Sequence, residues 1–85
     1  MRATSASAIS RLLKKAGYGV VTTRSREGLL VTRDFRGASV TAQFDLEEMA
    51  IRRAKDVAEF LCLKGFKVRQ YEMIVYVTKS EDVNG

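Results

Sequence analysis

Two stretches of the chain repeat apolar residues at the spacing of an α-helix. In the longer stretch, residues 45–64, one face of the helical wheel collects the apolar side chains. These are Leu46, Ala50, Ala54, Val57, Ala58 and Leu61. The shorter stretch begins after Ser5 or Ser7, either of which can cap a helix, and ends at about Ala16. The pattern therefore predicts two amphipathic helices.

The ends of both stretches carry recognisable signals. Asp45 and Glu48 have the spacing of a capping box, in which the Asp45 side chain accepts a hydrogen bond from the first turn. Gly65 before Phe66 is typical of a left-handed C-terminal cap closed by an apolar contact. Gly17 before Tyr18 repeats that signal at the end of the first helix. The sequence around the two caps is alike, which indicates either a duplicated unit or the common chemistry of such caps.

Between and after the helices the pattern changes to the alternation and β-branching of strands. Strands are predicted over 19–24, 29–35 and 38–44, with turns at 25–28 and 36–37. Residues 67–71 and 73–79 are predicted to form a final hairpin or a strand bent around Glu72. Short turns favour antiparallel neighbours. We predict an α+β fold of order α-β-β-β-α-β-β, in which both helices pack on one face of a single antiparallel sheet.

The length of 85 residues predicts one domain, with residues 1–4 and 80–85 expected to be disordered. No run approaches the roughly 20 apolar residues of a membrane span, and the N-terminus lacks the apolar segment of a secretory signal. With a single cysteine, Cys62, no intramolecular disulfide can form. We therefore expect a cytoplasmic protein without membrane contact.

The residue types in the chain give little indication of catalysis. The chain contains no histidine, so the usual general base and the His-containing metal sites are absent. Cys62 is predicted to be a buried thiol that acts as a small apolar group. Asp45, Glu47 and Glu48 are explained by the positive end of the helix dipole rather than by a metal. We expect no enzymatic activity, no metal and no cofactor.

The charge is unevenly distributed along the chain. The net charge is +5, but residues 1–44 carry eight Lys/Arg and two acids, whereas residues 45–85 are close to neutral. A basic surface steers a domain towards a polyanion. The candidate nucleic-acid-binding residues are Arg11, Lys14, Lys15, Arg24, Arg26, Arg33 and Arg36. The leading hypothesis is a small basic binding module that contacts nucleic acid through its N-terminal half.

The alternative hypothesis is a module for binding a protein, either a host protein or a second copy of the chain in a homodimer. Residues 73–77 form an apolar run with Ile74 and Tyr76 as candidate contacts. If this run lies at the edge of the sheet, it can pair with another strand. If it lies in the centre of the sheet, the same residues are explained as core.

Residues 9–31, ISRLLKKAGYGVVTTRSREGLLV, resemble the helix and strands of HicA-type toxins and of the double-stranded-RNA-binding-like architecture. The toxin family places a catalytic histidine after a Gly-Ser in this region, where this chain has Ser25-Arg26-Glu27-Gly28, so ribonuclease activity is not implied. The acidic segment 45–48 also differs from the lysine-rich helix start of that RNA-binding family. The LLKKAG segment and the late Gly-aromatic-strand resemble small accessory proteins of actinobacterial phages, which implies the host cytoplasm.

Overall fold

The computed structural model describes residues 5–34 and 37–78 and contains two helices and five strands in the predicted order. The elements are α1 (Ala6–Lys15), β1 (Val20–Val21), β2 (Gly28–Asp34), β3 (Gly37–Gln43), α2 (Glu47–Leu63), β4 (Lys67–Tyr71) and β5 (Ile74–Thr78). The predicted α+β class is confirmed. The predicted disorder at 1–4 and 80–85, and Arg36 of the predicted turn, lie outside the described residues.

The five strands form one sheet in the order β1-β2-β3-β5-β4. Three of the four pairings are antiparallel, as predicted, but β1 pairs with β2 in parallel, Val20 opposite Leu29 and Val21 opposite Leu30. The prediction of a purely antiparallel sheet is therefore wrong at this edge. Parallel neighbours normally need a connection of about a dozen residues. Here β1 has only two residues, so the short connection 22–27 can return the chain to the start of β2.

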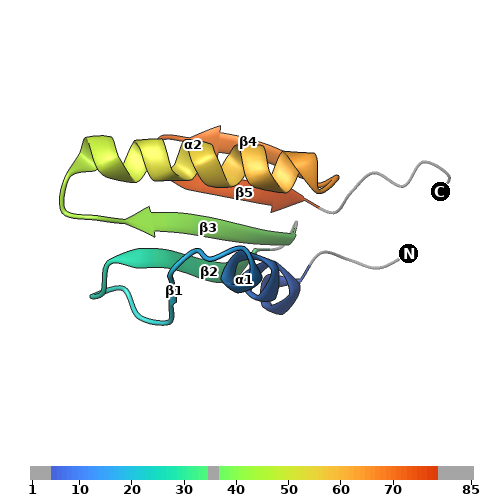
Figure 1. Ribbon diagram of the computed structural model, residues 1–85, viewed down its shortest axis with the longest axis horizontal. Helices are drawn as coiled ribbons and strands as arrows, with labels where there is room; N and C mark the ends of the chain where they lie inside the picture. Colours follow the sequence, from blue (N-terminus) through green and yellow to red (C-terminus); the bar gives the residue numbers. More distant parts are fainter. Residues whose placement is uncertain (1–4, 35–36, 79–85) are drawn as a thin grey trace, which may run out of the picture.

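Both helices pack on the same face of the sheet, as predicted (Figure 1). α1 lies against β1, β2 and β3, while α2 lies against β3, β4 and β5. Their buried side chains join one core with the strand residues that point to this side. That core consists of Ile9, Leu13, Leu29, Ala38, Val40, Ala42, Ala50, Ala54, Val57, Leu61, Val75 and Val77. The small alanines at positions 50 and 54 allow α2 to approach the sheet closely.

Both helix C-termini form the predicted caps. The N–H of Phe66 donates to the Leu61 carbonyl at 3.1 Å, and the N–H of Tyr18 donates to the Leu13 carbonyl at 3.0 Å. Gly65 and Gly17 have φ values of +97° and +96°, which supply the left-handed turn that this motif requires. The N-terminus of α1 is capped by Ser5, whose hydroxyl accepts from the Ala8 N–H at 3.1 Å.

Two local predictions for α2 are wrong. The helix begins at Glu47, so its N-cap is Leu46, which makes no side-chain cap hydrogen bond, and Asp45, the predicted N-cap, lies one residue before it. The Asp45 N–H instead donates to Oε2 of Glu27 at 3.2 Å. Cys62 is exposed rather than buried, because the buried apolar positions of the last turns end at Leu61.

Candidate binding surface

The face of the sheet opposite the helices carries side chains from all five strands, and we call it the open face. Residues paired across neighbouring strands point to the same side, so the register defines its membership. One row crosses the sheet as Thr32, Ser39, Tyr76 and Arg69. The next row consists of Leu30, Thr41, Ile74 and Tyr71. Polar hydroxyls, two tyrosines and cations thus share one surface.

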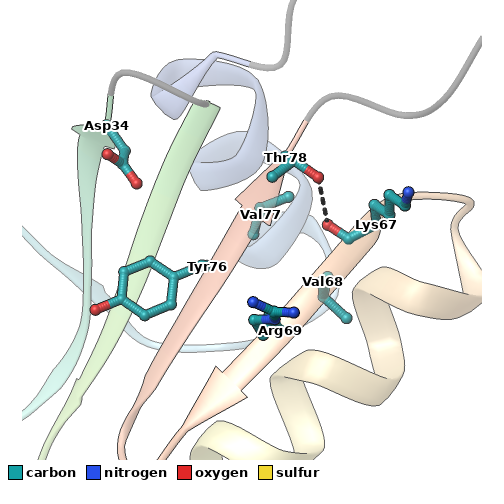
Figure 2. A pocket seen from close by; sticks show the side chains of 7 residues that line it. All are labelled: Asp34, Lys67, Val68, Arg69, Tyr76, Val77 and Thr78. Atoms are coloured by element: carbon teal, nitrogen blue, oxygen red, sulfur yellow. Dashed lines mark hydrogen bonds between the residues drawn. The ribbon is translucent and has the colours of Figure 1, made fainter.

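A hollow of about 650 Å³ lies at one end of this face (Figure 2). It is lined by Asp34, Lys67, Val68, Arg69, Tyr76, Val77 and Thr78. The Tyr76 ring projects from β5 across β3 towards β2, while the Arg69 guanidinium stands over β4 (Figure 2). The Thr78 hydroxyl donates to the Lys67 carbonyl at 3.3 Å and ties the two strands together beside the hollow. The hollow is therefore built on a paired region of the sheet.

The opposite end of the open face is bordered by the connection 22–27. Gln43 pairs with Gly28 and so lies on the open face, where its Nε2 donates to the Arg26 carbonyl at 2.8 Å and the Thr23 carbonyl at 3.0 Å. These two bonds hold the connection at this end of the sheet. Arg24 and Arg26, both exposed, therefore lie at the border of the open face.

The edge strand β4 presents a pattern that the sequence-based reasoning missed. Lys67, Arg69 and Tyr71 alternate with Val68 and Gln70, and only the alternating outer set is exposed. A strand points every second side chain to the same face, so Lys67, Arg69 and Tyr71 form one stripe. The two-residue period was readable in the sequence, but the strand order was needed to show which side the stripe faces.

The cations on or beside this surface, Lys67, Arg69, Arg24 and Arg26, outnumber the carboxylates, which are Asp34 on the face and Glu27 and Glu72 at its borders. Within the described residues, Arg24, Arg26 and Arg69 have no ion-pair partner. Asp34 is the single carboxylate whose position in the register places it on the open face. Because unpaired guanidinium groups keep their full capacity for anions, this face is suited to a ligand that carries several negative charges.

The structure divides the seven predicted nucleic-acid-binding residues among different surfaces. Arg11, Lys14 and Lys15 are exposed on α1, on the helix side of the sheet. Arg33 pairs with Ala38, so it also points to the helix side, where it is exposed. Only Arg24 and Arg26 border the open face, and Arg36 lies outside the described residues. The six of these residues that the structure describes do not lie on a single element.

The two predicted partner-binding residues lie on the open face but not at an edge. β5 is bonded to β3 on one side and to β4 on the other, so its backbone cannot accept a further strand. Neither helix covers its open-face side chains, however, and Tyr76 is 37% exposed while Ile74 is half-buried. Contact of Ile74 or Tyr76 with a partner would therefore involve side chains rather than strand addition.

The helix side of the molecule holds the aromatic contacts. Tyr18 packs against Phe60 with ring centroids 5.6 Å apart, and the cations of Arg53 and Lys64 lie over Phe44 and Phe60. Burial raises the pKa of the Tyr18 hydroxyl, and the nearby Asp56 carboxylate acts in the same direction. Tyr18 is therefore the tyrosine that is occupied in packing, in contrast to the two on the open face.

Other kinds of site are not seen in the described part of the chain. Across residues 5–34 and 37–78, no three acidic, histidine or cysteine side chains are grouped to hold a metal ion. Neither α1 nor α2 is long and apolar enough to cross a membrane. Comparisons with protein-family models, with curated proteins and with solved structures found no match for this chain.

Proposed function

We propose that this protein is a small, non-enzymatic binding module for nucleic acid and that the open face is its binding surface. One observation carries the proposal: unpaired arginines border a sheet face that neither helix covers. Arg24 and Arg26 lie at one end and Arg69 stands over β4 near the hollow at the other. Three strand spacings across the sheet span about 14 Å and the four residues from Gly28 to Thr32 along β2 span about 13 Å, so the two groups lie roughly 19 Å apart on the diagonal. A polyanion crossing the face can therefore contact both groups.

The overall charge acts in the same direction. The net charge of +5 attracts a polyanion over distances comparable to the Debye length and raises the rate of encounter. The contribution of the helix side is a separate hypothesis, because Arg11, Lys14 and Lys15 face away from the sheet surface. Binding at the open face and binding at the helix side predict different effects of charge-removing variants, so one experiment can distinguish the two hypotheses.

The test is fluorescence anisotropy of labelled oligonucleotides measured from about 50 to 200 mM salt. Neutralisation of three phosphates by Arg24, Arg26 and Arg69 gives a log–log slope of about −2.1 for single strands and about −2.7 for duplex. The affinity should then fall roughly 20- to 40-fold across that range. Arg69→Gln should reduce the slope by about 0.7–0.9, because one phosphate contact is lost.

Arg52→Gln is the matched control, since Arg52 is exposed on α2 and its loss changes the net charge equally. It should leave the slope unchanged. The combined Arg11→Gln, Lys14→Gln and Lys15→Gln variant tests the helix side. A slope that falls by about two in this variant but not in Arg69→Gln would refute the open face as the surface. Absence of binding at low salt would refute the function itself.

A further inference from the structure

The open face exposes two aromatic rings that the fold does not use. Tyr71 is 65% exposed and Tyr76 is 37% exposed, although large apolar groups are normally removed from water on folding. Among the described residues, the ring and cation–ring contacts involve Tyr18, Phe44 and Phe60, all on the helix side. Tyr71 therefore presents about two thirds of its surface, and Tyr76 about a third, to a flat ligand.

We infer that the open face binds single-stranded nucleic acid, with its bases stacked on Tyr71 and Tyr76; this inference rests on the proposed function. Every base has an aromatic face, and stacking on a protein ring is tolerant of sequence. In a duplex the base faces are covered by the neighbouring base pairs. A flat sheet surface can therefore stack on the bases of a single strand but not on those within a duplex.

The two tyrosines are close together in the register of the sheet. Tyr71 lies opposite Ile74, and Tyr76 is two residues further along the same strand, so the two tyrosines are diagonal neighbours. Such neighbours are about 7–8 Å apart at the backbone. Arg69 lies directly opposite Tyr76 and two residues from Tyr71 along β4, so it is next to both tyrosines and can hold a phosphate of the strand stacked on them. Rings and cation are thus interleaved on one surface.

The hollow beside Tyr76 favours a base over a phosphate. Its volume of about 650 Å³ is in the range of small-molecule sites. Asp34 lines one wall, and a carboxylate repels a phosphate but accepts hydrogen bonds from the N–H groups of a base. The sugar–phosphate backbone of the nucleic acid would therefore pass over Arg69, and one of its bases would enter the hollow against the Tyr76 ring.

The experiment compares oligothymidine of about ten nucleotides with a duplex of the same length by anisotropy at low salt. The single strand should bind more tightly. Tyr71→Thr and Tyr76→Thr should each weaken single-strand binding roughly 5- to 100-fold, without changing the salt slope, because no charge is removed. Tyr71→Phe and Tyr76→Phe should retain the affinity, since they keep the ring. Leu63→Ala is the control, because Leu63 is 86% exposed at the end of α2.

The protein carries an internal control for nuclear magnetic resonance, because only three tyrosines occur in the chain. Stacked bases should move the ring signals of Tyr71 and Tyr76, whereas Tyr18, on the helix side, should keep its position. The same spectra show whether each variant is folded, so a loss of affinity can be separated from unfolding.

The failures of this inference and of the proposed function are distinguishable. Three outcomes would overturn the stacking inference: equal or tighter binding of the duplex, full affinity in both threonine variants, or a shift of the Tyr18 ring signals alone. The proposed function would still stand in these cases if the binding depends on salt. No binding of either oligonucleotide at low salt would overturn both. A dimer mass by light scattering that becomes monomeric in Tyr76→Thr would assign the open face to a second copy of the chain and also overturn both.

Discussion

Gly37 lies in the central strand β3 against the backbone of β5, and its replacement by alanine should strongly destabilise the fold. It begins β3 and pairs with Asp34 of β2 and with Thr78 of β5. Its φ of +149° lies in a region that residues with a Cβ rarely adopt. A Cβ built at Gly37 would overlap with the carbonyl oxygen of Val77 and lie 3.4 Å from the Thr78 Cα. Glycine is therefore required at position 37 for two reasons: the positive φ, and the lack of room for a Cβ beside β5.

The cost can be divided into these two parts. The strained backbone conformation costs roughly 1–3 kcal/mol. The overlap is with backbone of a central strand, so no side-chain rotation relieves it, and separating the strands costs roughly another 1–3 kcal/mol. We expect Gly37→Ala to lower the free energy of unfolding by about 2–6 kcal/mol. A domain of this length has roughly 4–13 kcal/mol in total, so the variant loses a large fraction of its stability.

Gly65→Ala is the matched control, because Gly65 also has a positive φ but a Cβ there would meet no atom within 4 Å. Its cost should be limited to the conformational part, about 1–2 kcal/mol. Urea unfolding followed by circular dichroism gives both free energies. An unchanged m value would show that the variants expose as much surface on unfolding as the wild type does, so that the free energies can be compared. Equal losses in the two variants would refute the argument that β3 and β5 leave no room for a Cβ at Gly37.

Three further outcomes are expected. Leu13→Ala should cost about 2–5 kcal/mol in urea unfolding, because the side chain is fully buried, whereas Leu63→Ala should stay within about 0.5 kcal/mol. Burial raises the pKa of Tyr18, so the folded state keeps the phenol proton to higher pH than the unfolded state does. The free energy of unfolding should therefore fall as the pH rises above about 10. Thermal melts at about pH 9 and 11 should show a smaller fall for Tyr18→Phe than for the wild type. Asp34→Ala should weaken oligonucleotide binding a few-fold in the anisotropy assay, because the acceptor for the N–H groups of a base is lost from the hollow; tighter binding would indicate a phosphate there and contradict a base.

The parts of the fold that depend on local chemistry could be predicted from the sequence. The caps at Gly17 and Gly65 follow from hydrogen bonds within six residues, and the alternation of Ala38, Val40 and Ala42 follows from the period of a strand. The start of α2 was predicted incorrectly, because Glu27, a residue distant in sequence, accepts the Asp45 N–H that Glu48 would have accepted in the predicted capping box. Local patterns carry no information about such a partner.

Strand order could not be predicted for the same reason. The parallel pairing of β1 and the central place of β5 depend on contacts between distant segments, so the sequence left Ile74 and Tyr76 as either edge or core. The structure gives a third arrangement, a central strand covered on one face only. The candidate site changed accordingly: of the predicted basic residues, Arg24 and Arg26 remain at the open face, and Arg69 and Tyr71 join them.

The alternation in β4 also explains how the binding surface and the core can be altered separately. Val68 packs against the core while Arg69 points to the open face, so shifting the register of β4 by one residue would place Arg69 in the core. The cost of burying an unpaired guanidinium makes that shift strongly unfavourable. The outward cations therefore help to specify the register that exposes them. It follows that Arg69→Gln and Tyr71→Thr should change binding with little loss of stability, since both side chains are exposed and neither fills the core.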